Sequence, residues 1–290
     1  MVWGAGLVIV KPAFAVTTPF RFLLYRLTIA ALLATPILFY FFFKKKNLIK
    51  HLPIIIGLEL IGTTLALSLL YAGLRVTTAI EASLITSSTP VFISILGVIF
   101  LKEKEETHEL IGTSLAFLGA LLLTLFPIFQ GHAQLDGVSL TGNLLIIGQN
   151  LATASYFILA KKYYQKIPKF FVTSVSFYLG IITFFGLSIW TADWQLPKLL
   201  MQIQQDLTSW SVWRASGYMA IFGSIIGLTT YIKGQEKIEA SEAALFSYLQ
   251  PLVYIPLGVM WLGEEVYWWQ LASLALILFG VFWAERRVKK

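Results

Sequence analysis

Ten mostly apolar stretches, separated by short segments with charge, Pro or Gly, fill almost all of this 290-residue chain. A bilayer core about 30 Å thick is crossed by about 20 helical residues, and a helix satisfies its own backbone hydrogen bonds in lipid. The stretches are too uniformly apolar for the alternating strands of a membrane barrel. The pattern predicts an all-α, polytopic integral membrane protein with ten transmembrane helices. The expected spans are 1–16, 19–43, 52–73, 76–101, 108–128, 142–161, 170–191, 212–232, 239–262 and 265–285.

Composition excludes a soluble globular protein. Hydrophobic residues make up 57% of the chain and charged residues 13%, and the mean hydropathy is +0.76. The net charge of +7 comes from short basic clusters between apolar stretches, which is a topology signal and gives no reason to expect nucleic acid as a partner.

The distribution of Lys and Arg predicts the orientation. If the N-terminus is cytoplasmic, sixteen basic residues lie in inner segments and four in outer ones. Both termini are therefore expected in the cytoplasm. The expected location is the cell membrane, that is, the inner or plasma membrane. The outer loop 191–211 contains a candidate interfacial helix from Pro197 to Trp210. The chain opens on an apolar stretch without a basic leader, so no cleaved signal peptide is expected; the first span is short, which would fit truncation upstream.

An internal repeat appears when the chain is compared with itself at an offset of 161 residues. Gly62 then aligns with Gly223, Glu81 with Glu242, Pro90 with Pro251 and Gly119 with Gly280. The two copies, 1–130 and 140–287, contain five spans each. Because five is odd, the second copy must be inverted in the membrane, and two inverted halves around a midplane site are typical of secondary transporters.

The same residues resemble the EamA-type family of the drug/metabolite transporter superfamily over nearly the whole chain. The resemblance is carried by Trp3-Gly4, Pro19, Tyr71-Ala72, Ala243-Ala244-Leu245 and Leu262-Gly263-Glu264, among others. Lys102-Glu103 departs from the usual Gly-Glu. The resemblance implies a transporter, and members are reported to export amino acids, metabolites or drugs.

Three charged residues of the first half share one depth, roughly 8 to 10 Å below the outer end of their spans at about 1.5 Å per residue: Lys11, Arg26 and Glu81. One interpretation places them in a cavity, where Glu81 balances one cation and the other is left for a substrate carboxylate or phosphate. The alternative is that Lys11 extends to the headgroups and that Arg26 pairs with Glu81.

Two further carboxylates are candidates for gating or coupling. Glu59 could couple transport to protons, or could be neutral and bonded to Thr63 or Ser68. Glu242, the repeat mate of Glu81, could be a cytoplasmic gate residue or a carboxylate favoured by a helix N-terminus.

Pro90 and Pro251 lie mid-span at equivalent positions, where each should break its helix. Polar residues gather near them, a pattern that points to a midplane site. The remaining candidates for substrate binding are Trp3, Tyr71, Ser87, Gln149, Tyr156, Tyr248 and Gln250.

Enzyme chemistry is not expected. The chain has no cysteine, its three histidines are far apart, and it has no nucleotide-binding or catalytic motif, so neither a cofactor nor a metal is predicted. The hypothesis is a secondary transporter, most simply an exporter, of small organic solutes by alternating access. The alternative is a membrane-embedded protein without flux, such as a lipid-modifying enzyme or a receptor. The oligomeric state is left open.

Overall fold

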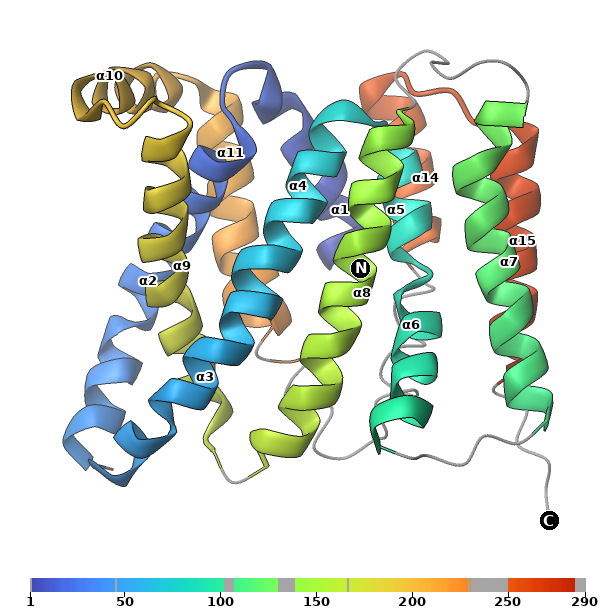
Figure 1. Cartoon of the computed structure of the whole chain (residues 1–290). Coiled ribbons are helices and arrows are strands. Elements are labelled where there is room, and N and C mark those ends of the chain that lie inside the picture. Colours follow the sequence, from blue (N-terminus) through green and yellow to red (C-terminus); the bar gives the residue numbers. More distant parts are fainter. Residues whose placement is uncertain are drawn as a thin grey trace.

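The computed structural model describes residues 2–44, 46–101, 107–129, 139–165, 167–228, 230 and 250–284. Within these residues the chain is helical and contains no strand. Helices labelled α are α-helices, and those labelled η are 3-10 or π-helical segments (Figure 1). In chain order they are α1 Val2–Val10, η1 Lys11–Ala15, α2 Pro19–Lys44, η2 Lys46–His51, α3 Leu52–Glu59, η3 Leu60–Leu65, α4 Ala66–Val76, α5 Ala79–Thr86, α6 Thr89–Leu96, η4 Gly97–Leu101, α7 Thr107–Phe129, α8 Leu140–Tyr163, α9 Lys169–Trp190, α10 Leu196–Leu207, α11 Trp210–Tyr218, η5 Met219–Leu228, α14 Pro251–Leu257, η7 Gly258–Leu262 and α15 Trp268–Ala284.

Several helices of the described residues are long enough to span a membrane. Five helical segments are long and apolar enough to cross a bilayer, and three shorter apolar helices accompany them. Their ends agree with the expected spans within a few residues, so the predicted fold class, a polytopic all-α membrane protein, is confirmed. Much of the expected span 239–262 lies outside the described residues. The five long segments are Pro19–Phe41, Leu48–Val76, Ala79–Phe100, Leu140–Tyr163 and Lys169–Trp190.

The last spans of the two halves pack directly against each other. A Cβ on Gly112 of α7 would lie 2.3 Å from the carbonyl oxygen of Gly280 in α15, and one on Gly119 would lie 2.8 Å from the Ile277 side chain. Later residues of α7 thus meet earlier residues of α15, so the two helices are antiparallel (Figure 1). Since α7 and α15 begin at positions 161 residues apart, this is the inverted relation that five spans per half require.

π-Helical segments also follow the repeat. η4 and η7 begin and end at positions 161 residues apart, and η3, shifted by the same amount, falls inside η5. A π-turn carries an extra residue, and such turns are frequent at functional sites. The two halves therefore share local backbone irregularities as well as sequence.

The fourth span is broken where Pro90 predicts it. α5 ends at Thr86, Ser87 and Ser88 form a turn, and α6 begins at Thr89. Proline lacks the N–H that a continuous helix would use. The two serines bond backward instead, Ser87 Oγ to the carbonyl oxygen of Ser83 and Ser88 Oγ to that of Ile85.

α10 lies across one end of the spans (Figure 1), and this end is called the α10 face below. Its Leu200 and Met201 are exposed, whereas Asp206 is buried. Arg21 of α2 donates to Asp206 from Nε over 2.6 Å, and the Tyr25 hydroxyl donates to the same carboxylate over 2.8 Å. This buried ion pair connects α10 to α2, the second span. α10 corresponds to the interfacial helix expected from Pro197 onward.

Candidate functional site

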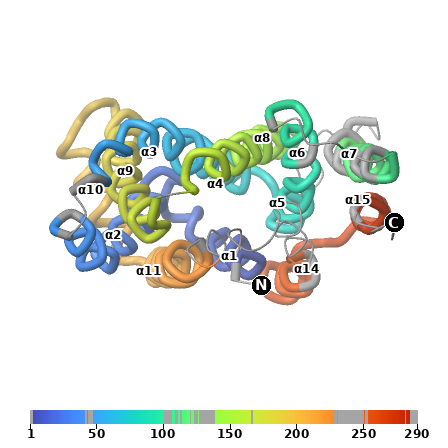
Figure 2. Tube along the Cα trace, turned by 90° about the horizontal axis from the view of Figure 1, so that it is seen from below, coloured from blue at the N-terminus to red at the C-terminus, as the bar shows by residue number. Residues whose placement is uncertain are grey.

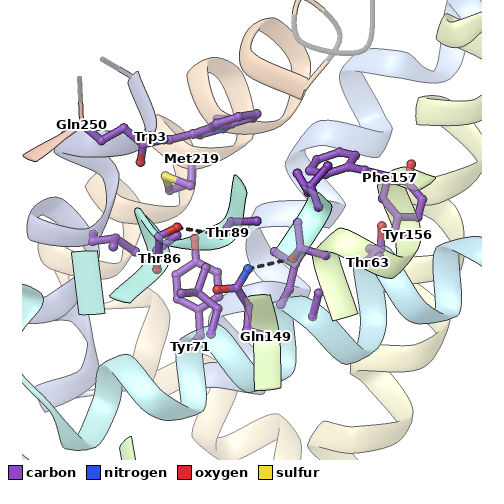
Figure 3. A pocket seen from close by; sticks show the side chains of 18 of the residues that line it. Trp3, Thr63, Tyr71, Thr86, Thr89, Gln149, Tyr156, Phe157, Met219 and Gln250 are labelled. Carbon is purple, nitrogen blue, oxygen red and sulfur yellow. Dashed lines mark hydrogen bonds between the residues drawn. The ribbon is translucent and has the colours of Figure 1, made fainter. Parts of the chain in front are cut away.

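A cavity of about 200 Å³ lies between the two halves. The helices that supply its lining, among them α1, α2, α4, α5 and α8, are neighbours in the view of Figure 2, and side chains of its wall are drawn in Figure 3. Both halves contribute to it. First-half lining residues are Trp3, Leu7, Arg26, Glu59, Gly62, Thr63, Ala66, Leu67, Leu70, Tyr71, Thr86, Thr89, Pro90 and Ile93; second-half ones are Gln149, Thr153, Tyr156, Phe157, Met219, Gly223 and Gln250.

Eight of the residues singled out in the sequence line this one space. They are Trp3, Arg26, Glu59, Tyr71, Pro90, Gln149, Tyr156 and Gln250. Three others, Lys11, Glu81 and Ser87, do not line it. Tyr248 and Glu242 lie outside the described residues, and Pro251 begins α14.

Arg26 is buried and is held by neutral groups. Its Nε donates to Ser224 Oγ over 2.9 Å and its Nη1 to the Tyr71 hydroxyl over 2.8 Å. The Tyr71 ring also lies under the guanidinium, with 5.8 Å from Cζ to the ring centroid. Ser224 belongs to η5 and Tyr71 to α4, so the side chain bridges the two halves.

The alternative in which Arg26 pairs with Glu81 is wrong. Glu81 accepts from Asn143 Nδ2 over 2.9 Å and from Gln270 Nε2 over 2.5 Å. With its oxygens bonded to amides of α8 and α15, the fully buried Glu81 ties α5 to the second half. Equal depth in the membrane did not bring the two charges together because they point to different neighbours.

Lys11 also has a structural contact in place of the cavity or the headgroups. Its Nζ donates to the carbonyl oxygen of Leu74 over 2.7 Å and to that of Thr77. The carbonyl of Leu74 belongs to the last turn of α4 and Thr77 caps that helix, and a cation at this end is favoured by the helix dipole. Ser87 bonds the Tyr254 hydroxyl over 2.8 Å, which joins the break in the fourth span to α14.

Glu59 lies at the cavity wall at the end of α3. Its Oε1 accepts from the Tyr156 hydroxyl over 2.7 Å and from that of Tyr164 over 3.2 Å, and its Oε2 accepts from Thr63 Oγ1 over 2.7 Å. Thr63 in turn bonds Ser176 of α9. Of the two partners that the sequence suggested for Glu59, Thr63 forms the hydrogen bond, whereas Ser68 bonds the carbonyl oxygen of Thr64.

Close backbone approach shapes the same wall. A Cβ on Gly62 would lie 2.4 Å from the Tyr156 ring, and one on Gly223 would lie 2.7 Å from Met219 Cε. The Trp3 indole donates to the carbonyl oxygen of Gly223 over 2.9 Å. The repeat aligned these two glycines, and that alignment was the available signal for them. Phe157 and Met219 were missed because nothing marks them apart from other span residues.

The fold and the cavity between its halves define a polytopic membrane protein with an internal, mostly apolar cavity that contains a few polar groups. The chain belongs to the EamA-like transporter family, which it matches over residues 1–125 and 140–285. It is therefore assigned as a transporter of the drug/metabolite type, and this assignment points away from catalysis.

Individual relatives agree with the family. The uncharacterized transporter YyaM of Bacillus subtilis is 28% identical over 83% of this chain and 76% of its own length. An uncharacterized transporter of Archaeoglobus fulgidus is 25% identical over 98% of this chain and 95% of its own. A crystal structure with 17% identity superposes with a TM-score of 0.62 over 98% of this chain and 94% of that one, which shows the shared fold.

Proposed function

We propose that this protein is a secondary transporter that carries small organic solutes across the cell membrane by alternating access, with the cavity as its substrate site. The observation that carries the proposal is that the cavity wall is built from both inverted halves. A site between two such halves becomes reachable from one side at a time when they rock. Export is the direction proposed.

Cysteine accessibility tests the cavity's role, because the natural chain contains no cysteine. Thr86→Cys places a thiol at the cavity wall. Thr28→Cys is a matched control, since both threonines are half-buried and bond the carbonyl oxygen four residues earlier, yet Thr28 does not line the cavity. A membrane-impermeant thiol reagent should label Thr86→Cys at a rate that a transported solute changes, and leave the control rate unchanged.

Flux must be shown separately. The reconstituted protein should move at least one solute from a panel of amino acids, organic anions, sugars, nucleosides and cationic drugs into or out of liposomes. A cross-link that locks the halves together at the α10 face should abolish that flux while the protein stays folded. Flux that continues with the halves locked, or no flux of any solute, contradicts the proposal.

Glu59 is the residue proposed to couple transport to protons. A carboxylate that accepts three O–H donors must reorganise them when it binds a proton, because a protonated oxygen becomes a donor itself. The groups that hydrogen-bond to it in the described structure are hydroxyls: Thr63 of η3, Tyr156 of α8 and Tyr164, which caps α8. Ser176 of α9 bonds Thr63 in turn. Since Tyr156 lines the cavity, protonation would reach the substrate site. Glu59→Gln should make flux independent of a pH gradient, and flux that keeps its gradient dependence contradicts this role.

Orientation follows from the charge asymmetry. With both termini in the cytoplasm, a reporter fused after Lys290 should be active only as a cytoplasmic reporter, and one near Gly137 only as an external one. Both reporters on the same side contradict this topology.

A further inference from the structure

The cavity contains a cation that no carboxylate of the described structure balances. Arg26 is 6% exposed, and its two bonds go to the Ser224 and Tyr71 hydroxyls. A guanidinium has five N–H donors, so these bonds leave three for another partner. An unbalanced charge in the membrane interior is costly unless it faces a polar cavity or meets an opposite charge.

The buried carboxylates of the described residues are all engaged elsewhere. Asp206 binds Arg21, and Glu81 binds Asn143 and Gln270. Glu59 shares the cavity with Arg26, yet it is 1% exposed and is bonded by three hydroxyls of the protein. None of the three forms an ion pair with Arg26.

A second, independent group in the cavity lacks a partner. Gln149 lies on α8 and is 5% exposed. Its Nε2 donates to Thr153 Oγ1 over 2.7 Å, while its buried Oε1 has no hydrogen-bond partner. If the amide were rotated by 180°, Nε2 would take the place of Oε1 and would lack a partner instead. A buried polar atom without a partner costs about 1–3 kcal/mol, and Figure 3 shows this side chain among those that line the cavity.

Most of the remaining wall is apolar. It includes Leu7, Leu67, Leu70, Ile93 and Phe157. A ligand that fits this wall has an apolar body, because these side chains can bury apolar surface but have no hydrogen-bonding groups for a polar one.

From these contacts we infer that the substrate is a small organic anion with an apolar body, whose anionic group binds Arg26 and whose second polar group bonds Gln149. The inference rests on the cavity being the substrate site proposed above. A carboxylate matches the planar fork of the guanidinium and balances its charge. An ammonium group would meet the same guanidinium as a like charge, and Glu59 is already satisfied by its hydroxyls.

Binding of matched probes to the purified full-length protein tests this without any flux. The probes are 3-phenylpropanoate, 3-phenylpropanamide, 3-phenylpropylamine and phenylalanine, which share a body and differ in charge. Affinity is read from the rise in thermal unfolding temperature with probe concentration. The wild type should bind the propanoate about tenfold or more tightly than the amide, the amine or phenylalanine, since a hydrogen bond to a charged group contributes about 1.5–3 kcal/mol.

Variants then locate the contact. Arg26→Met should abolish the preference for the propanoate, and Arg26→Lys should keep part of it. Gln149→Leu should weaken the binding of 3-(4-hydroxyphenyl)propanoate, whose hydroxyl can donate to Oε1, more than that of 3-phenylpropanoate, which has no second polar group. Arg75→Gln is the matched control, because it removes an equal charge from an exposed position at the end of α4 and should leave the preference unchanged. If Arg26→Met does not fold, the order of the four probes on the wild type still decides.

The inference is overturned if the amide, the amine or phenylalanine binds the wild type as well as the propanoate, if no propanoate binding is seen, or if Arg75→Gln loses the preference as Arg26→Met does. Its failure is distinct from that of the transport proposal. Selective propanoate binding without flux would uphold the anion site and contradict transport, whereas flux of neutral or cationic solutes without propanoate binding would do the reverse.

Discussion

Glu264 accepts the backbone N–H of Ala79, with 2.7 Å between Oε1 and the nitrogen, and its Oε2 lies 2.8 Å from the nitrogen of Ile80. A carboxylate of the second half thereby satisfies the first two donors of α5 in the first half. The first N–H groups of a helix have no partner within it, and a negative charge there is favoured by the helix dipole. This contact joins the two halves outside the cavity.

Removing that carboxylate should destabilise the protein. Glu264→Ala leaves two part-buried N–H groups without acceptors, so we expect a loss of about 1–3 kcal/mol in unfolding free energy, with Glu264→Gln intermediate because one acceptor oxygen remains. Thermal unfolding in detergent measures it. The neighbouring exposed Glu265→Ala is the control, and equal effects at both positions would show that the contact with α5 is not the cause.

The ion pair that holds α10 should matter far more than an exposed one in the same loop. Asp206→Ala leaves Arg21 buried and unpaired, which should cost about 3–5 kcal/mol; Arg21→Met combined with Asp206→Leu should cost less. Asp193 pairs with Lys198 over 2.5 Å but is exposed, so Asp193→Ala should change the stability by about 1 kcal/mol or less. Unfolding midpoints compare the three. A double variant as unstable as Asp206→Ala would contradict the explanation.

Arg26 and Glu81 should act independently. Because their hydrogen bonds go to different residues, the losses of stability from Arg26→Leu and Glu81→Leu should add in the double variant within about 0.5 kcal/mol. Glu81 and Gln270 share a bond of 2.5 Å, so a cycle with Gln270→Leu should show a coupling of about 0.5–3 kcal/mol. A coupling energy of the same size between Arg26 and Glu81 would show that the two side chains interact, and would contradict their assignment to separate partners.

Two glycines of one span should differ in their tolerance of a methyl group. A Cβ on Gly62 would overlap the Tyr156 ring at 2.4 Å, whereas one on Gly57 would meet nothing within 4 Å. Gly62→Ala should therefore displace Tyr156, disturb its bond to Glu59, and reduce flux and stability. Gly57→Ala should keep flux and gain about 0.5–1 kcal/mol. Equal flux in the two variants would show that this wall of the cavity tolerates displacement.

Sequence patterns predicted the architecture well because the bilayer constrains it so strongly. Span ends such as Pro19 and Trp190 follow from apolar length, and the break before Pro90 follows from the missing N–H of proline. The repeat at one offset predicted inverted halves, and the antiparallel packing of α7 on α15 agrees with that prediction.

Eight candidate site residues reached the cavity, and all except Pro90 have polar groups, which inside a membrane must face protein or water. The same rule applies equally to Lys11, Glu81 and Ser87, so it cannot separate a cavity residue from one that stabilises helix packing. Lys11 is expected at the same depth as Arg26, yet its ammonium group donates to a backbone carbonyl at the end of α4 and does not line the cavity.

The sequence by itself determined the all-α membrane fold and the ends of the long apolar helices, since these depend on apolar length along the chain. Only the tertiary structure decided which buried charge is balanced by the protein and which is left for a ligand. That choice depends on distances of about 3 Å between groups far apart in the sequence, such as Glu81 and Gln270 or Arg26 and Ser224. Such contacts are set by how the helices rotate and pack against one another, which depth in the membrane does not specify.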